Sequence, residues 1–311
     1  MENSRSGSFA ICNSILFRIE NDKSAQYIHS KYNVGALNGN SLTLKPYELL
    51  YLYYRKRLKP VNPFYSNSMI LISNLFEEKD LYMWRVYLDL KKEGSKISIN
   101  NESLTISKKN EKLSVKRVIY PIREKSKVGT DWLISSAGHN IASVDDDGDI
   151  TYYIVDLATL EGTNHMELSS DPPLKIGNRG INMNNMKPQW MGDHFEDLVI
   201  LSEGETDYIN GAMGSDPVSK VYRELISRGL IVKTGFKYGC NFRAYRGTMD
   251  DHSDFLIHIL GDDAGWYEIS RAVRLSASVR KEMIFAVLKG DNCIFVRIRR
   301  IKSIQEMNVK N

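Results

Sequence analysis

Apolar residues in the first half of the chain recur with two spacings, one typical of strands and one typical of helices. Residues 41–51 predict a short apolar strand, a polar cap and a helix. Residues 84–94 predict an amphipathic helix that ends at a glycine, the usual C-terminal stop. Residues 142–153 predict two strands joined by a tight turn.

The same three patterns recur in the same order in the second half. Residues 198–208 repeat the strand, cap and helix, residues 220–229 repeat the helix, and residues 285–295 repeat the hairpin. Between the halves, residues 170–185 are rich in Pro, Gly and Asn, a composition typical of a connector. We interpret this order as an approximate internal duplication with a boundary near residue 160.

The chain beyond residue 217 predicts a mixed sheet with helices. We expect helices at 219–229 and 269–279, and strands at 231–233, 240–246, 255–260, 282–287 and 293–300. The first copy lacks or shortens the counterpart of residues 234–280. An activity limited to one copy is therefore expected within residues 234–280 of the second copy. The expected fold class is therefore mixed α+β, built from two tandem related units.

Charge is distributed unevenly along the chain. The 311 residues include 42 Lys and Arg and 38 Asp and Glu, and the resulting net charge of +4 does not identify a nucleic-acid binder. Residues 161–216, however, hold 3 basic and 10 acidic residues, whereas residues 217–311 hold 17 basic and 10 acidic residues. Basic residues gathered in one segment favour a polyanionic ligand. A solvated basic face is the alternative, and composition alone slightly favours it.

Cysteine content and hydropathy limit the environment. Cys12, Cys240 and Cys293 are too scattered for a disulfide framework and show no paired spacing for zinc. The first 20 residues contain only a short, interrupted apolar run, and no apolar stretch reaches membrane-spanning length. These features predict a soluble protein in a reducing, cytoplasmic setting, with no membrane partner.

Tyr245, His252 and Lys281 form a trio suited to RNA cleavage without a metal ion. Each residue type alone is common in structural roles. Attack of a 2′-hydroxyl on the adjacent phosphate has three needs: a base for the 2′ proton, an acid for the departing 5′-oxygen, and a cation for the extra negative charge of the phosphorane. The three residue types cover these three needs.

Four motifs surround this trio in order along the chain. They are VKTGFKYG at 232–239, NFRAY at 241–245, His252-Ser253, and SRAVRL at 270–275 followed by VRK at 279–281. Together they closely resemble archaeal tRNA-splicing endonucleases, and the match extends over roughly residues 219–300. The N-terminal copy resembles the family in outline only. This resemblance implies the long, two-unit, homodimeric subclass.

The resemblance also implies a domain plan. Each unit is expected to combine a small α/β N-terminal subdomain with a nuclease-like, mixed-sheet C-terminal subdomain. We expect a degenerate noncatalytic unit at 1–160, a linker at 161–180 and a catalytic unit at 181–311, divided into subdomains at 181–216 and 217–311. The first unit is degenerate because it carries none of the trio's motifs.

The family's chemistry can be assigned to this trio residue by residue. The resemblance makes Tyr245 the general base toward the 2′-hydroxyl, His252 the general acid at the 5′-oxygen, and Lys281 the stabiliser of the phosphorane. The implied activity is excision of introns from precursor tRNA by a lyase-type transesterification at both bulges of a bulge-helix-bulge motif. The resemblance also implies that the reaction needs no metal and no other cofactor. The implied products have 2′,3′-cyclic phosphate and 5′-hydroxyl ends.

Two further groups acquire roles from the resemblance. Arg274 and Arg297 match arginines that stack on either side of a flipped-out bulge base, and simple exposure to water is the alternative. A turn of four aspartates lacks the spacing of a calcium-binding EF-hand loop. A tight β-turn is the alternative to the family's acidic loop, which docks into a basic cleft across the dimer, and we favour the docking role, which makes these residues candidates for dimer assembly. These aspartates are Asp145, Asp146, Asp147 and Asp149.

Two other classes of protein remain open from the residues. One is a noncatalytic RNA-binding or scaffold subunit that keeps the fold and the basic segment. The other is a metal-dependent nuclease that uses Asp250, Asp251 and Asp254, for which a divalent-metal requirement would be diagnostic. Retention of all three catalytic residue types favours the enzyme over the scaffold.

Overall fold

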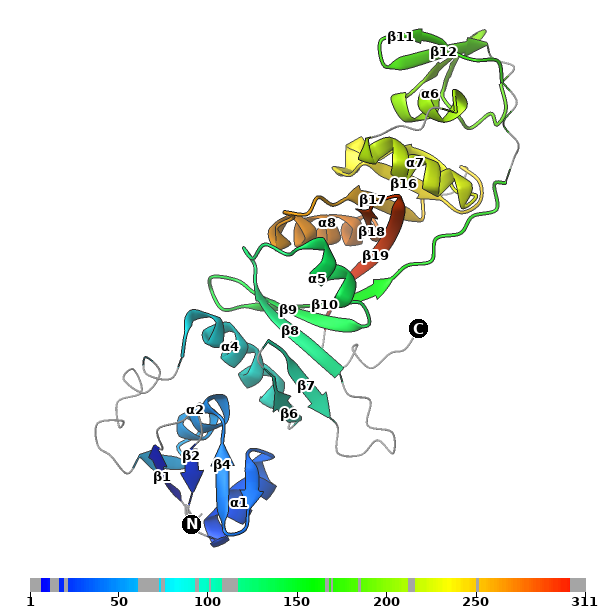
Figure 1. Cartoon of the computed structure of the whole chain (residues 1–311). Coiled ribbons are helices and arrows are strands. Elements are labelled where there is room, and N and C mark those ends of the chain that lie inside the picture. The colour runs from blue at the N-terminus through cyan, green and yellow to red at the C-terminus, as the bar shows by residue number, and fades with distance from the viewer. Residues whose placement is uncertain are drawn as a thin grey trace. The chain divides into compact units, whose positions relative to one another are not determined.

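The computed structural model describes residues 7–11, 17–19, 22–60, 73, 76–92, 95–100, 102–107, 117–165, 168, 170–183, 186–211, 216–249 and 252–302. Cys12, Asp250 and Asp251 lie outside this range. The described residues form two compact units (Figure 1). Unit 1 takes in the residues up to 124, together with 139–152 and 302. Unit 2 takes in residues 125–138 and 153–301.

Unit 1 combines helices with two sheets. Its elements are β1 (Gly7–Ile11), β2 (Phe17–Ile19), α1 (Asp22–Tyr32), β3 (Ala36–Asn38), β4 (Ser41–Leu44), α2 (Pro46–Tyr54), β5 (Leu58–Pro60), α4 (Glu78–Lys92), β6 (Lys96–Ile99), β7 (Leu104–Ser107), β8 (Arg117–Arg123) and β9 (His139–Val144). One sheet has the strand order β3-β4-β2-β1-β5, and the other includes the order β9-β8-β7-β6. β10 (Ile150–Leu157) begins in unit 1 and ends in unit 2.

The junction between β4 and α2 shows why this part of unit 1 folds. Leu42 and Leu44 alternate with polar residues, so that both point to one face of the sheet, and both are completely buried. Pro46 is suited to the first turn of α2 because its missing N–H would have no helical partner there. The Glu48 carboxylate accepts hydrogen bonds from the backbone N–H groups of Gly35 (2.8 Å) and Lys45 (2.9 Å). The strand and helix predicted for residues 41–51 are confirmed.

Unit 2 contains a small sheet, a larger sheet and flanking helices. Its elements are α5 (Thr130–Ser135), β11 (Leu174–Ile176), β12 (Arg179–Met183), β13 (Asp193–Phe195), β14 (Leu198–Leu201), α6 (Glu203–Ile209), α7 (Pro217–Ser227), β15 (Ile231–Thr234), the 3₁₀ turn η2 (Phe236–Tyr238), β16 (Phe242–Tyr245), β17 (Phe255–Ile259), α8 (Trp266–Ser278), β18 (Glu282–Lys289) and β19 (Asn292–Ile301). The small sheet has the order β11-β12-β14-β13, and the larger sheet includes the order β15-β16-β17-β18-β19-β10.

The small sheet is tied to α6 by a helix cap and an apolar cluster. Ser202 accepts a hydrogen bond from the backbone N–H of Glu205, and the Glu205 carboxylate accepts in return from the Ser202 N–H at 2.9 Å. This reciprocal arrangement is a capping box, which fixes the start of α6. Val199 and Leu201, on the face of β14 toward α6, are completely buried.

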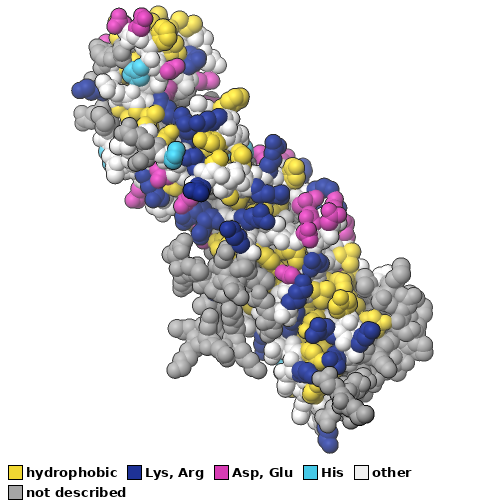
Figure 2. All heavy atoms as spheres, turned by 180° about the vertical axis from the view of Figure 1, so that it is seen from behind, with side chains coloured by type: hydrophobic (Ala, Val, Ile, Leu, Met, Phe, Trp, Pro, Cys, Tyr) yellow, Lys and Arg dark blue, Asp and Glu magenta, His cyan; other side chains and the backbone are white. Residues whose placement is uncertain are grey.

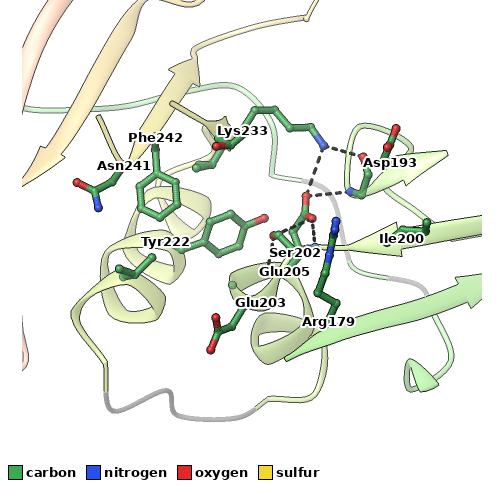
Figure 3. Close-up of a pocket in the computed structure, with 15 residues that line it drawn as sticks. Arg179, Asp193, Ile200, Ser202, Glu203, Glu205, Tyr222, Lys233, Asn241 and Phe242 are labelled. Carbon is green, nitrogen blue, oxygen red and sulfur yellow. Dashed lines mark hydrogen bonds and ion pairs between the residues drawn. The ribbon is translucent and has the colours of Figure 1, made fainter. Parts of the chain in front are cut away.

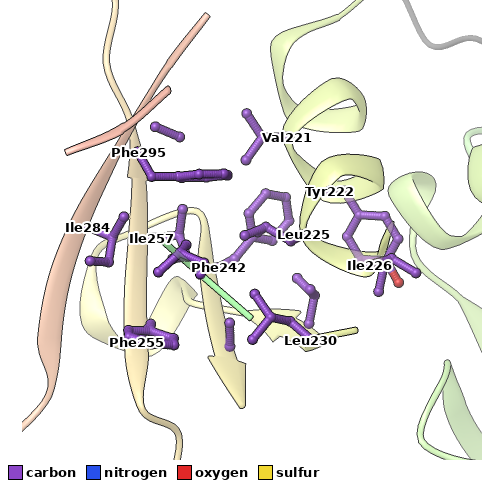
Figure 4. Close-up of a cluster of buried hydrophobic side chains, with 14 residues drawn as sticks. Val221, Tyr222, Leu225, Ile226, Leu230, Phe242, Phe255, Ile257, Ile284 and Phe295 are labelled. Carbon is purple, nitrogen blue, oxygen red and sulfur yellow. The ribbon is translucent and has the colours of Figure 1, made fainter. Parts of the chain in front are cut away.

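The core of the larger sheet is the main apolar cluster of unit 2 (Figure 4). The ring of Phe242, the ring of Phe255 and the side chain of Ile284 come from three neighbouring strands, and Val221 and Leu225 of α7 pack on them. The alternate residues of the same strands are buried on the other face of the sheet, where α8 packs. These are Leu256, Met283, Phe285 and Val287. The sheet is therefore enclosed between α7 and α8.

The larger sheets of the two units share one order of elements. In unit 2, α7 is followed by β15, β16 and β17, which pair antiparallel in turn, and β17 pairs parallel with β18. In unit 1, α4 is followed by β6, β7, β8 and β9, with the same succession of antiparallel, antiparallel and parallel pairs. A parallel pair requires a crossover connection, which is the 13-residue α8 in unit 2. The connection from β8 to β9 contains the 6-residue α5, which belongs to unit 2.

The expected mixed α+β class is confirmed, with some boundaries shifted. α4 begins at Glu78, earlier than the predicted residue 84, and α8 begins at Trp266 rather than at 269, because Trp266 is itself part of the buried face. The structure adds α5, β11 and η2, which the apolar spacing did not predict. β11 lies within residues 161–180, where a linker was expected. No helix in the described residues is both long and apolar enough to cross a membrane.

Candidate active site

The strand order brings the predicted trio to one end of the larger sheet. β16 ends at Tyr245, and Ala244 pairs with Phe255 at the start of β17. Phe255 in turn pairs with Glu282 at the start of β18, directly after Lys281. His252 lies in the loop that leads into β17. The end of one strand and the beginnings of two others therefore bring Lys281, which is distant in sequence, to the sheet end of Tyr245 and His252.

Asp254 fixes this end of the sheet. Its backbone N–H donates to the carbonyl of Ala244 at 3.0 Å, and its own carbonyl accepts from the N–H of Glu282 at 3.1 Å. Its carboxylate accepts from the N–H of Arg246 at 2.8 Å. One residue thus links the chain on either side of Tyr245 to the chain that carries Lys281. The arrangement is determined by the backbone and does not depend on long, mobile side chains.

Lys281 is joined directly to the loop that carries His252. Its ammonium donates to the backbone carbonyl of Ser253 at 2.8 Å. An ammonium has three N–H donors, so two remain for other acceptors. Ser253 is buried, whereas the neighbouring His252 is exposed. The side chain of Lys281 is therefore held at a fixed point beside the segment of the general-acid candidate.

The backbone before Lys281 has an unusual conformation. Arg280 has a φ of +55°, the left-handed region that non-glycine residues rarely adopt. The N–H of Lys281 donates to the carbonyl of Ser276 at 3.0 Å, and the N–H of Arg280 donates to that of Ala277 at 3.3 Å. These two bonds form a Schellman C-cap at the end of α8, in which glycine is the usual left-handed residue. The cap turns the chain sharply from the helix into β18 and places Lys281 beside the Ser253 carbonyl.

The three side chains differ in exposure. Tyr245 is only 5% exposed, whereas His252 is exposed and Lys281 is half-buried. The guanidinium of Arg243 lies 5.9 Å from the centroid of the Tyr245 ring, on the same face of β16. A cation therefore accompanies the most buried member of the trio.

Arg274 and Arg297 have different neighbours. Arg297 on β19 donates to the Glu282 carboxylate at 3.2 Å, which holds its guanidinium beside the start of β18. Arg274 is exposed on α8. Burial raises the pKa of the Tyr153 phenol, and the charge of Arg274 opposes that rise, which puts the guanidinium close to that phenol. Arg297 is thus adjacent to the trio through Glu282, and Arg274 approaches β10.

The four aspartates predicted for assembly form a tight turn in unit 1. The Asp145 carboxylate accepts from the N–H groups of Asp147 (3.1 Å) and Asp149 (2.8 Å), so it serves the turn itself. Asp146 lies 3.5 Å from a guanidinium nitrogen of Arg123. Gly148 has a φ of +81°, which favours glycine at this position. The carboxylates of Asp147 and Asp149 lie on exposed residues of the turn.

A pocket of about 520 Å³ lies in unit 2, and none of the trio lines it (Figure 3). Figure 3 shows Lys233 reaching toward Glu205. The Lys233 ammonium lies 3.4 Å from the Glu205 carboxylate and donates to the backbone carbonyl of Gly192 at 2.9 Å. Glu205 is also the capping-box carboxylate of α6. Burial and the charge of Glu205 raise the pKa of the nearby Tyr222 phenol. Two of the charged residues that line this pocket, Lys233 and Glu205, therefore join the two sheets.

The metal-dependent alternative rests on three aspartates, of which the structure describes Asp254. In the segments that the structure covers, no group of three or more His, Cys, Asp and Glu side chains is arranged to hold a metal ion. The Asp254 carboxylate caps the N–H of Arg246. Asp250 and Asp251, the other two residues of that hypothesis, lie outside the described residues.

The charge segregation predicted from the sequence has a counterpart on the surface. Figure 2 shows Lys and Arg side chains gathered over the part of unit 2 that follows the small sheet, and few of them over the small sheet itself. The basic segment that begins at residue 217 contributes Arg243, Arg274 and Lys281 to this part of unit 2. The trio therefore lies in the more basic part of the chain.

The sequence pattern did not predict one structural feature beside the trio. The 3₁₀ turn Phe236–Tyr238 brings the ring of Tyr238 to 5.9 Å from the Lys281 ammonium. The available signal was the pair of glycines, Gly235 and Gly239, that encloses these three residues. Two glycines four residues apart between strands are typical of a turn with tight backbone geometry.

Comparison with known proteins gives a consistent result. Residues 217–295 match the family described as tRNA intron endonuclease, catalytic C-terminal domain. The chain is 32% identical to a tRNA-splicing endonuclease of Thermoplasma volcanium over 96% of this chain and 99% of that protein. It is 30% identical to one of Picrophilus torridus, over 93% of this chain and 95% of the relative. A shorter match, 42% identical over 26% of this chain, links it to a tRNA-splicing endonuclease of Methanosarcina mazei.

Proposed function

The chain belongs to the tRNA-splicing endonuclease family, and we propose from that membership that it excises introns from precursor tRNA. We further propose that it cuts both bulges of a bulge-helix-bulge motif without a metal ion and leaves 2′,3′-cyclic phosphate and 5′-hydroxyl ends. The observation that best supports this chemistry is the gathering of Tyr245, His252 and Lys281 at one end of one sheet, through hydrogen bonds at residues 253 and 254.

The proposed reaction is a transesterification. The 2′-oxygen attacks the adjacent phosphorus, and the bond from phosphorus to the 5′-oxygen breaks. Tyr245, as the general base, takes the proton of the 2′-hydroxyl, and His252, as the general acid, gives a proton to the departing 5′-oxygen. Proton transfers of this kind typically contribute about 10²–10⁴-fold each. Lys281 directs its two remaining N–H donors at the phosphorane oxygens.

Arg274 and Arg297 are proposed to hold an extruded bulge base. Planar guanidinium groups stack well on bases, and lysine replaces them poorly. The ion pair of Arg297 with Glu282 supports this role, because it fixes the guanidinium beside Lys281. The exposed position of Arg274 on α8 leaves its guanidinium accessible to RNA.

We propose that the chain is a tandem pair of related units, with a degenerate copy at 1–160, a linker at 161–180 and a catalytic copy at 181–311. The catalytic copy would divide into an N-terminal subdomain at 181–216 and a catalytic subdomain at 217–311. The shared succession of strand pairings in the two larger sheets supports this plan. Two such chains would form a homodimer with two catalytic copies, one for each bulge.

The acidic turn is proposed to dock on the partner chain of that dimer. Asp147 and Asp149 are the better candidates for contact, because Asp145 serves the turn and Asp146 faces Arg123. Replacing Asp147 and Asp149 with Asn should lower the particle mass measured by light scattering. The matched control replaces Asp193 and Asp197 with Asn, which removes the same charge from unit 2. Equal masses for both variants and the native chain would refute the docking role.

One observation favours a second candidate, a noncatalytic RNA-binding subunit. Tyr245 is 5% exposed, and a general base must reach the substrate. In this second function, the basic segment would bind RNA and the trio would stabilise the sheet end.

Cleavage of a labelled bulge-helix-bulge RNA in excess chelator distinguishes the two candidates. The native chain should give 2′,3′-cyclic phosphate and 5′-hydroxyl ends, and His252→Ala should cleave at least about 100-fold more slowly. His194→Ala, which removes an exposed histidine from β13, is the matched control and should cleave at the native rate. Tight binding without cleavage by the native chain would establish the noncatalytic subunit instead.

A further inference from the structure

A rigid aromatic turn lies beside the trio and has no assigned role. The turn Phe236–Tyr238 connects β15 to β16. Phe236 is 87% exposed, the largest exposed fraction among the large hydrophobic side chains that the structure describes. An isolated exposed apolar side chain needs no explanation by itself. The position of Phe236, the constrained backbone of its turn and the nearby cations together indicate a binding role.

The backbone of the turn is tightly constrained. The N–H of Gly235 donates to the carbonyl of Asn241 at 3.0 Å, and the carbonyl of Gly235 accepts from the N–H of Tyr238 at 2.8 Å. A Cβ atom at Gly235 would lie 2.5 Å from the Cys240 sulfur and 2.8 Å from the Cys240 carbonyl oxygen, so any side chain there would force the surrounding atoms to shift. Gly239 ends the turn with a φ of +64°. The Phe236 ring is therefore carried on a fixed support.

The turn also adjoins the proposed catalytic cation. The Lys281 ammonium lies 5.9 Å from the centroid of the Tyr238 ring, and the Lys237 ammonium lies 5.0 Å from the same centroid. Two cations thus flank Tyr238, and Phe236 is two residues away on the same turn. Exposed aromatic rings with adjacent cations are what single-stranded nucleic acids bind, because bases stack on the rings and phosphates approach the cations.

We propose that Phe236 is a stacking platform for one unpaired base of the RNA, adjacent to the phosphate that is cut. This inference rests on the proposed function for its ligand and extends it to a residue with no assigned contact. The platform positions the bulge nucleotide next to Lys281 and takes no part in proton transfer. Every base has a stacking face, so the platform is tolerant of base identity.

The test uses the full chain and a bulge-helix-bulge RNA with a 2′-deoxy nucleotide at the attacked position, which binds but is not cut. Phe236→Ala should weaken binding by roughly 5- to 150-fold, the equivalent of about 1–3 kcal/mol for one stacked base. Phe236→Trp should retain binding, because it keeps a flat ring. Phe195→Ala is the matched control, since it removes a 68% exposed phenylalanine from the small sheet and should change nothing.

A substitution cycle with the RNA identifies the base. Bulge nucleotides are replaced one at a time by abasic residues, and the affinity of each RNA is measured with the native chain and with Phe236→Ala. At the stacked position, the abasic residue should weaken binding by the native chain and have no further effect on Phe236→Ala. Loss of affinity at every position in both proteins alike would overturn the proposal.

The outcomes separate this inference from the proposed function. If the native chain cleaves the all-ribose RNA and Phe236→Ala binds as tightly as the native chain, the stacking platform is refuted and the proposed function stands. If the native chain does not cleave and His252→Ala matches it, the proposed reaction fails. A fall in the particle mass of Phe236→Ala would also overturn the platform, because the exposed ring would then belong to an interface between chains.

Discussion

Replacing Lys281 with Met removes the proposed phosphorane stabiliser while keeping an unbranched side chain of similar length. In the native chain, the ammonium donates one hydrogen bond of 2.8 Å to the Ser253 carbonyl, and the described residues provide no second acceptor for its other two N–H groups, which can face the phosphate. The substitution therefore has two effects. It removes the charge that would face the phosphate, and it releases the segment that carries His252.

The two effects have different magnitudes and are measured differently. Removing a preorganised donor that faces a developing negative charge typically costs about 10²–10³-fold in the chemical step. Losing a charged hydrogen bond to the carbonyl of the buried Ser253 costs about 1–3 kcal/mol of stability. We expect Lys281→Met to cleave roughly 10²–10³-fold more slowly under single-turnover conditions, with unfolding free energy lowered by about 1–3 kcal/mol.

The assay combines single-turnover cleavage, affinity for the 2′-deoxy RNA and urea unfolding. Lys281→Arg is the informative partner variant, because it keeps the charge and changes its geometry. It should recover part of the rate. The reasoning would be refuted by a loss of less than about tenfold for Lys281→Met in a folded protein, since an effect that small falls below that of a single preorganised donor. It would also be refuted if Lys281→Met lost affinity and cleaved the bound RNA at the native rate.

Three further predictions concern the support of the site and of unit 1. Gly235→Ala should destabilise the chain and slow cleavage more than Gly239→Ala does. A Cβ at Gly235 meets atoms at 2.5–2.9 Å, whereas a Cβ at Gly239 meets open space and is disfavoured only by the positive φ of that residue. Urea unfolding and cleavage rates of the two variants test this order. Arg280→Gly should raise the unfolding free energy by about 0.5–1 kcal/mol, because it relieves a left-handed φ, and an unchanged or lowered midpoint would contradict this. Burial lowers the pKa of Lys91 from 10.5 to about 8, so the unfolded chain binds that proton more tightly between pH 8 and 10.5. The unfolding free energy of the native chain relative to Lys91→Met should therefore rise across that window, by up to about 3 kcal/mol, and a flat difference would refute it.

The pattern of residues predicted much of the fold where local signals agree. The hairpin of β18 and β19 follows from alternating apolar residues on either side of a Gly-Asp-Asn turn, and its strands pair with neighbours in sequence. The strand and helix at residues 198–208 follow from an apolar run and a Ser-x-x-Glu cap. β11 was missed because its Leu174 and Ile176 stand in a stretch of Pro, Gly and Asn, which is typical of a connector.

By itself, the sequence determined which residue types are present and where the local elements lie. It supplied Tyr245, His252 and Lys281 with their motifs, since these depend on residue identity and spacing. The tertiary structure decided that they lie at the same end of one sheet, because β17 and β18 pair in parallel across the α8 crossover and Asp254 joins both to β16. It also decided the burial of Tyr245 and the closeness of the Tyr238 turn to Lys281. Those contacts depend on pairing between strands that are distant in sequence, and such pairing leaves no local periodic signal.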